Sequence, residues 1–248
     1  MIPISKSVDL EAAAKGTLME NPSEFRSLVQ RLNFVASNTR PDIAVAVNLL
    51  SRHAKQPTSE LMQIALKVLA YLKTTRGVVL LYERMEQLAF NLYSDASFKR
   101  KGAATTIGVA CMINGTAFSW DVYKDRKAYT SANEAEFAAI YQAARSSAYF
   151  VDLMRFIGVQ VETPVEIECD NSGAVAMSEK SVQWDSRDAD PEQLKVVGMV
   201  REKQIIVRKI DTELNPADLL TKPLESELFR RHLYTLGLAG YDASFDIV

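Results

Sequence analysis

The spacing of apolar residues changes at Gly77, and this change constrains the possible folds more than any other feature of the chain. Before Gly77, apolar residues recur at helical spacing in three segments that open at Pro22, Pro41 and Pro57. After Gly77, short apolar runs alternate with helical patterns, which is typical of strands mixed with helices. The pattern predicts a lead-in over 1–20, a small helical subdomain over 21–78 and an α/β domain over 79–248.

The strand signals of the second half centre on a hairpin. Thr106–Ile113 and Thr116–Trp120 are apolar runs, and Asn114-Gly115 between them suits a type I′ turn. Ser131-Ala-Asn-Glu134 is a capping-box sequence and predicts a helix that runs to about residue 156. Further strands are predicted at 78–82, 88–94, 165–169 and 205–210, and further helices at 172–179, from 216 and at 226–236. Together these signals predict a mixed sheet with helices packed on it.

Four acidic residues in this half lie where their carboxylates could meet at one point. Asp95 lies in a strand-like run, Glu136 near the start of the long helix, Asp170 at a strand end and Asp218 at a helix start. Like charges in one pocket repel, so convergence would require divalent cations, which prefer oxygen ligands. Two such ions roughly 4 Å apart support phosphodiester cleavage. The constellation therefore suggests a metal-dependent enzyme that acts on phosphates.

Three of these acids also have an ordinary structural interpretation. Asp170 could cap a helix, and Asp218 could complement a helix dipole. Glu136 could be a solvated helix residue, because Glu134 lies nearby in a similar context. Asp95 is the hardest to explain in this way, since aspartate is depleted in strands and unfavourable when buried unpaired. Spacing alone leaves the constellation a hypothesis.

Composition sets wider bounds on function. The chain is 48% hydrophobic and 24% charged, as expected of a globular protein, and its net charge of -2 does not indicate a nucleic-acid binder. No apolar stretch approaches the roughly 20 residues of a membrane helix, and no secretory signal is visible. Cys111 and Cys169 lie in apolar runs and are predicted to be buried thiols. These features predict a cytoplasmic or nuclear protein with no membrane partner and no zinc site.

Short motifs run in a characteristic order along nearly the whole chain. In the first part they are Phe25-Arg-Ser-Leu-Val29, Thr39-Arg-Pro-Asp-Ile-Ala-Val-Ala-Val47, Leu50-Ser-Arg52 and Val68-Leu-Ala-Tyr-Leu-Lys73. In the second part they are Tyr93-Ser-Asp-Ala-Ser97, Ser131-Ala-Asn-Glu-Ala-Glu-Phe137, Cys169-Asp-Asn171 and Ala217-Asp-Leu-Leu-Thr-Lys-Pro223. The second set resembles the ribonuclease H domain of copia-type LTR retrotransposon Pol polyproteins. The first set resembles the reverse-transcriptase thumb and connection region that precedes it.

The resemblance implies a ribonuclease H-like five-stranded mixed sheet with flanking helices. It implies an endoribonuclease that hydrolyses the RNA strand of RNA–DNA hybrids with two Mg²⁺ ions, for which Mn²⁺ can substitute, in partnership with the polymerase part of a reverse transcriptase. By motif position, the catalytic and metal-binding acids are Asp95, Glu136, Asp170 and Asp218, and the Ala-Glu-aromatic context selects Glu136 over Glu134. Weaker candidates for nucleic-acid contacts are Ser131, Asn171, Arg40 and Lys73.

Two departures from the family pattern leave alternatives open. Residues 209–215 contain no histidine, although many ribonucleases H have one just before the last aspartate. Acidic residues occupy 185–192, where family members carry basic ones, and this change should weaken phosphate binding. Reverse-transcriptase palm motifs are also absent, so polymerisation by this chain is not expected. The alternatives are a domesticated, weakly active or inactive module that binds nucleic acid or protein, and a structural fragment that requires its polymerase half.

Overall fold

The computed structural model describes residues 2–84, 88–98, 104–179 and 190–240. Contacts divide the chain into two compact units. One unit consists of residues 1–81 together with 222–248, and the other consists of residues 82–221. This division differs from the predicted domain of 79–248, because Phe229 of the last helix packs edge-on against Tyr71 and the last strand pairs with residues 79–80.

The unit of residues 82–221 is built on a five-stranded mixed sheet with the order β4-β3-β2-β5-β6. Its strands are β2 Phe90–Ser97, β3 Thr106–Ile113, β4 Thr116–Lys124, β5 Val165–Cys169 and β6 Ile205–Lys209. Its helices are α5 Ala132–Phe156, α6 Ser172–Glu179, α7 Pro191–Arg201, the 3-10 helix η2 Thr212–Leu214 and α8 Asp218–Thr221. β3 pairs antiparallel with both β2 and β4, whereas β5 pairs parallel with both β2 and β6. The predicted fold class is confirmed.

The predicted hairpin is present at the edge of this sheet. Asn114 and Gly115 connect β3 to β4 with φ values of 51° and 78°, the left-handed conformation that a type I′ turn requires at both positions. The long helix α5 begins after Ser131, whose hydroxyl accepts a hydrogen bond from the Glu134 amide at 3.2 Å. Both local predictions therefore describe the structure, because turn and cap chemistry depend on a few adjacent residues.

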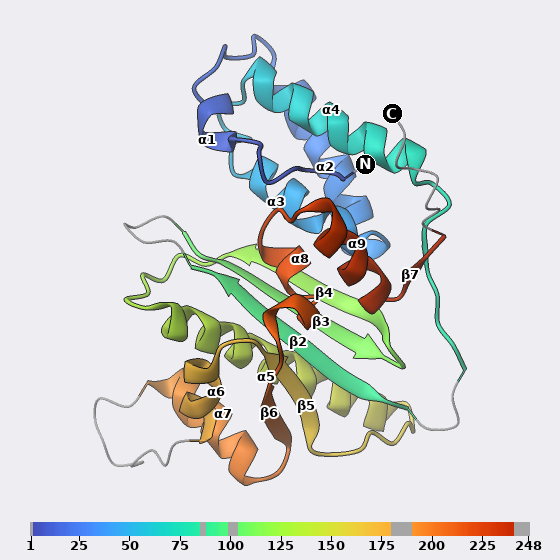
Figure 1. The fold of residues 1–248 in the computed structure, drawn as a ribbon, viewed down its shortest axis with the longest axis vertical. Coiled ribbons are helices and arrows are strands. Elements are labelled where there is room, and N and C mark those ends of the chain that lie inside the picture. Colours follow the sequence, from blue (N-terminus) through green and yellow to red (C-terminus); the bar gives the residue numbers. More distant parts are fainter. Residues whose placement is uncertain (1, 85–87, 99–103, 180–189, 241–248) are drawn as a thin grey trace. The chain divides into compact units, whose positions relative to one another are not determined.

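The two faces of the sheet have different roles. Leu92 and Ala96 of β2 lie in an apolar core with α5, α6 and α7. Successive strand residues point to opposite faces, so Asp95 lies on the other side, where α8 packs on β2 and β3. Figure 1 shows α5 and α8 on opposite faces of the sheet. One strand thus serves both the core and the acidic face.

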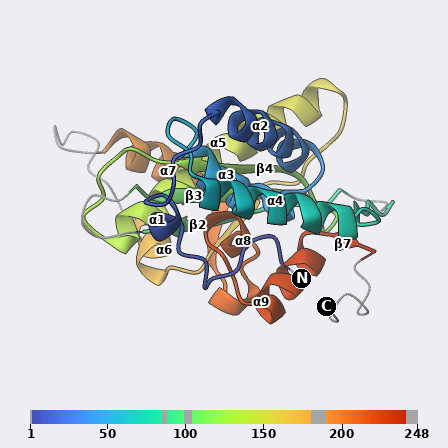
Figure 2. The same ribbon diagram turned by 90° about the horizontal axis from the view of Figure 1, so that it is seen from above.

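The second unit is mainly helical. Its elements are α1 Leu10–Ala13, α2 Pro22–Asn38, the 3-10 helix η1 Pro41–Ile43, α3 Ala44–Ser51, α4 Ser59–Thr74, β1 Val79–Leu80, α9 Ser226–Thr235 and β7 Leu238–Ala239. Helices α2, α3 and α4 pack against one another (Figure 2). Asn21 and Thr58 cap α2 and α4 through hydrogen bonds from the Ser23 and Leu61 amides, at 3.2 Å and 3.3 Å. Strand β1 pairs antiparallel with β7.

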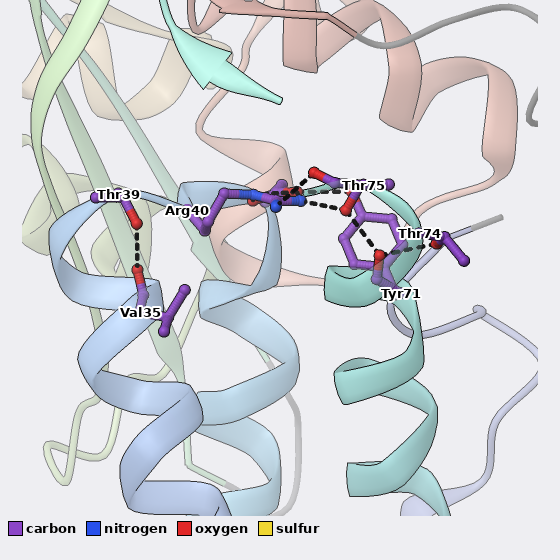
Figure 3. A network of polar contacts seen from close by, with 7 residues as sticks. Val35, Thr39, Arg40, Tyr71, Thr74 and Thr75 are labelled. Carbon is purple, nitrogen blue, oxygen red and sulfur yellow. Dashed lines mark hydrogen bonds and ion pairs between the residues drawn. The ribbon is translucent and has the colours of Figure 1, made fainter. Parts of the chain in front are cut away.

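A buried ion pair between the end of α2 and η1 is bonded to the end of α4. The Arg40 guanidinium donates to Asp42 Oδ2 at 2.6 Å, and to the Thr75 carbonyl and hydroxyl at 3.0 Å and 2.7 Å. The Tyr71 hydroxyl donates to the same Asp42 oxygen at 2.6 Å. Figure 3 shows Arg40 reaching from the end of α2 toward Thr75 at the end of α4. Burial by itself lowers the pKa of Arg40, but the hydrogen bonds and charge of Asp42 outweigh it and leave the pKa raised.

Removing one partner of this pair should destabilise the helical unit strongly. Asp42→Ala leaves the Arg40 guanidinium buried without its carboxylate, and we expect a loss of about 3–5 kcal/mol in the free energy of unfolding. Urea denaturation followed by circular dichroism measures this loss. The control is Asp152→Ala, which removes the exposed partner of Arg155 and should have little effect. Equal stability of the two variants would contradict a structural role for Arg40.

The same unit should lose stability in acid through His232 on α9. Its side chain is fully buried, and neither ring nitrogen has a hydrogen-bond partner among the described residues. Burial, followed by the charges of Arg231 and Lys222, lowers the pKa of His232 from 6.5 to about 4. Because the folded-state pKa is the lower one, the stabilisation is complete above pH 6.5 and is lost as the pH falls toward 4.

We therefore expect the free energy of unfolding to fall by roughly 1 kcal/mol per pH unit across this window on account of His232. Urea denaturation of wild type and His232→Leu over the window measures the slope, which should be shallower in the variant. His53→Leu removes the other histidine and is the matched substitution with which the His232→Leu slope is compared. Identical slopes for wild type and His232→Leu would rule out the assignment.

Candidate metal centre

Asp95 lies on the central strand of the sheet. It is 2% exposed and occupies the third-last pair of β2 with β3, opposite Gly108. Its Oδ2 accepts a hydrogen bond from the hydroxyl of Thr221, the last residue of α8. β2 is paired with β3 along its whole length and with β5 as far as Ser94, so the sheet holds the backbone around Asp95.

Asp170 follows directly after β5, the parallel neighbour of β2. Ser94 and Cys169 are register partners in these two strands, so the next residues, Asp95 and Asp170, lie side by side where β5 ends. The alternative role as a helix cap belongs to the neighbouring residue, because the side chain of Asn171 accepts the Ala174 amide at 2.9 Å. Asp170 is partly exposed.

Asp218 is brought to the same place by a turn that is fastened to β2. The fully buried Asn215 donates to the Ser94 carbonyl at 3.0 Å and accepts from the Ala217 amide at 3.2 Å. This amide side chain therefore ties the start of α8 to the strand that carries Asp95. Asp218 itself is 1% exposed.

A glycine in β3 lets this turn pack directly on the sheet. A Cβ atom at Gly108 would lie 2.7 Å from Thr221 Cγ2, 2.8 Å from Leu220 Cβ and 3.2 Å from the Ala217 carbonyl oxygen. These separations are shorter than van der Waals contact, so only glycine accommodates α8 at its present distance. Gly108 is thus a spatial requirement for the position of Asp218.

Glu136 and Glu134 have similar sequence contexts but different environments in the structure. Glu136 is 8% exposed, and its Oε2 accepts the Ala96 amide at 3.2 Å, next to Asp95. Glu134 instead accepts the Thr130 amide at 2.8 Å and the Thr130 hydroxyl at 2.7 Å. These hydrogen bonds lower the pKa of Glu134 and engage it at the helix N-terminus. The structure therefore brings Glu136, and not Glu134, to the acids.

The acids form two overlapping groups that share Asp170. One ligand atom from each of Asp95, Asp170 and Asp218 lies within 4.8 Å of the others, and the same holds for Glu136, Cys169 and Asp170. Carboxylate oxygens at this spacing repel one another and match the ligands preferred by Mg²⁺ and Mn²⁺. The residues present therefore fit a divalent-cation site.

Cys169 lies within the core beneath these acids. Its sulfur is 3.9 Å from Glu136 Oε2 and accepts the Asn171 amide at 3.5 Å. Burial, followed by the charge of Glu136, raises the pKa of this thiol strongly. Cys169 is thus a neutral thiol that donates a weak hydrogen bond to the carboxylate. The prediction that both cysteines are buried free thiols is confirmed.

The weaker candidates for nucleic-acid contacts have diverse surroundings. Arg40 is buried in the ion pair with Asp42, so its guanidinium is not presented to a phosphate, and the sequence-based suggestion is not carried further. Lys73 is exposed near the end of α4. The Ser131 hydroxyl and the Asn171 side chain both accept hydrogen bonds from helix N-termini. Sequence reasoning did not single out Asn215, Thr221 or Gly108, although Thr221 lies in the motif that contains Asp218 and Asn215 comes two residues before that motif.

The acidic 185–192 segment lies mostly outside the described residues, which resume at Asp190. Asp190 caps α7 by accepting the Glu192 amide at 2.9 Å. Lys127 contacts Asp190 at 3.4 Å and Glu192 at 3.0 Å, so a basic side chain is paired with the described acids of the segment. Helix α7 was not predicted, although Asp190-Pro191 is a cap followed by proline.

Comparisons with known proteins find relatives over most of the chain. The chain is 28% identical over 227 residues to the retrovirus-related Pol polyprotein from transposon RE1 of Arabidopsis thaliana, covering 90% of this chain and 15% of that protein. It is 27% identical over 218 residues to the one from transposon TNT 1-94 of Nicotiana tabacum, covering 87% and 16%. LC11-RNase H1, solved in complex with an RNA/DNA hybrid, has a TM-score of 0.40 and 20% identity over 53% of this chain and 93% of that one. No protein-family model matches the sequence.

The five-stranded mixed sheet with flanking helices is the α/β fold that the ribonuclease H resemblance implies, and its acids gather beside β2 and the end of β5. The homologues of the chain are retrovirus-related Pol polyproteins from copia-type transposons, which confirms the family resemblance read from the motifs. The chain spans about 15–16% of the length of these two relatives. None of the helices in the described ranges is both long and apolar enough to cross a membrane.

Adding a methyl group at Gly108 should displace α8 and disturb the acids. Gly108→Ala is expected to lower the free energy of unfolding by about 1–3 kcal/mol through overpacking. It should also weaken Mn²⁺ binding, because Asp218 moves with the turn. Denaturation and calorimetric titration with Mn²⁺ measure the two effects. Gly77→Ala is the matched control, since a Cβ there meets no atom within 4 Å. Unchanged Mn²⁺ affinity in Gly108→Ala would contradict the positioning role of this close approach.

Proposed function

We propose that the protein is an endoribonuclease that hydrolyses the RNA strand of RNA–DNA hybrids with two divalent cations. The observation that carries the proposal is the convergence of Asp95, Asp170 and Asp218 within 4.8 Å, with Glu136 bound to the amide that follows Asp95. The acids come from a strand, a strand end and two helices, so rigid elements set their spacing. Rigid elements fix the positions of metal ligands more precisely than a flexible loop would, which suits a site for a pair of cations.

The proposed role of the four acids is to hold Mg²⁺, for which Mn²⁺ can substitute. When bound, two such ions activate a water and stabilise the leaving oxygen of a phosphodiester. The Ala96 amide orients Glu136, and the Thr221 hydroxyl orients Asp95. Asp170 is the partly exposed member, so substrate and solvent would reach the centre on its side. Which acid binds which ion is left open.

The substrate is proposed from the relatives rather than from the acids alone. Acids and cations account for phosphodiester cleavage in general, whereas the homology to Pol polyproteins supports a hybrid formed during reverse transcription. Lys73, Ser131 and Asn171 remain proposed contacts to this hybrid, and the polymerase part of a reverse transcriptase remains a proposed partner.

A cleavage assay on an end-labelled RNA–DNA hybrid tests the function. Wild type should cut the RNA strand in Mg²⁺ or Mn²⁺, and chelation should abolish cleavage. Asp95→Asn keeps the shape of the side chain but removes a charge, and we expect a rate loss of at least about 100-fold. Glu134→Gln is the matched control and should retain activity, because Glu134 is engaged at the helix cap.

The outcomes separate the proposal from its rivals. A folded wild type that is inactive in both metals would overturn the enzyme and favour a domesticated binding module. Activity that appears only when the polymerase part is added in trans would favour the fragment interpretation. Equal loss in Glu134→Gln and Asp95→Asn would contradict the assignment of the acids.

A further inference from the structure

Thr221 links two of the acids through a single hydroxyl group. It is 2% exposed, and it follows Asp218 by three residues in α8. Its Oγ1 donates to Asp95 Oδ2 and also lies 3.3 Å from the backbone carbonyl oxygen of Asp218. The Thr221 hydroxyl therefore lies between the carboxylate of Asp95 on β2 and the backbone of Asp218 in α8.

The side chain of Thr221 is held in one orientation by its packing. Its methyl group lies over Gly108, where an added Cβ would approach to 2.7 Å. Gly108 is the β3 partner of Asp95, so the same strand pair supports the methyl group and the carboxylate. A β-branched side chain has few accessible rotamers, and the methyl contact in turn directs the hydroxyl toward Asp95.

A hydroxyl has one proton, and here it has two acceptors. A carboxylate is the stronger acceptor, so without a cation the proton is directed to Asp95. A carboxylate offers about four lone-pair sites, so a cation can bind it while Oδ2 keeps the hydroxyl as a donor. The Asp218 carbonyl, the ordinary partner of a threonine in a helix, is the second acceptor.

Resting on the proposed function, we infer that Thr221 is a positioning residue for metal binding at Asp95. Its hydroxyl fixes the orientation of the Asp95 carboxylate in the absence of a cation and keeps its bond to Oδ2 when a cation binds the carboxylate. Thr221 does not bind the ion itself. Its effect is to reduce the reorganisation that metal binding requires.

Calorimetric titration with Mn²⁺ in the absence of nucleic acid tests this inference, because it needs no nuclease activity. Thr221→Val keeps the branched shape over Gly108 but removes the hydroxyl, and we expect Mn²⁺ affinity to fall by about 10–100-fold. Thr221→Ser restores the hydroxyl and should recover most of the affinity. Thr74→Val is the control, because its hydroxyl also bonds a carbonyl three residues back, at 2.9 Å, in the helical unit.

Each outcome decides one of the proposals. Wild-type Mn²⁺ affinity in Thr221→Val would overturn the positioning role alone and leave the metal centre standing. A folded wild type that binds no Mn²⁺ would overturn the metal centre and the role of Thr221 together. If Thr221→Ser were as weak as Thr221→Val while both keep the wild-type melting temperature, packing rather than the hydroxyl would be responsible, and the inference would fail.

Discussion

Electrostatic repulsion among closely spaced carboxylates is the constraint that the structure of residues 82–221 has to meet. Ligand oxygens of Asp95, Asp170 and Asp218 lie within 4.8 Å of one another. Two unit charges at this separation repel by roughly 3 kcal/mol at an effective dielectric constant of about 20. An arrangement of this kind persists where rigid elements hold each acid and where donors or cations offset the repulsion. The central strand, the Asn215 amide and the Thr221 hydroxyl meet the first need, and the proposed cations meet the second.

The core and the acidic face are built from the same strands, so stability and function are coupled. Leu92 and Ala96 of β2 enter the apolar core with α5, whereas Asp95 points to the opposite face. Helix α5 contributes to both sides of this arrangement, because its apolar residues fill the core while Glu136 reaches the Ala96 amide. A change in core packing therefore moves the acids, and the close contact of α8 with Gly108 makes their spacing sensitive to a single methyl group.

The helical unit handles its buried carboxylate in a different way. The Asp42 carboxylate is paired with the Arg40 guanidinium and accepts a hydrogen bond from the Tyr71 hydroxyl. This carboxylate is thus stabilised within the protein itself. In sequence, Arg40 looks like an available basic residue, because burial is not visible in a single chain. Its bonds to Thr75 depend on the end of α4 lying beside the end of α2. The Lys127 contacts with Asp190 and Glu192 likewise join segments about 60 residues apart, which no local pattern indicates.

The sequence by itself determined the strands of the five-stranded sheet, the Asn114-Gly115 turn, the Ser131 cap and the motif positions of the four acids, because these follow from nearby residues and from family resemblance. It could not separate Asp170 from a helix cap or find the roles of Asn215, Thr221 and Gly108. Those depend on which backbone atoms approach one another across the sheet. Tertiary structure alone decided that Glu136 reaches the Ala96 amide while Glu134 stays at the cap, since the two differ only in the direction their side chains take from α5.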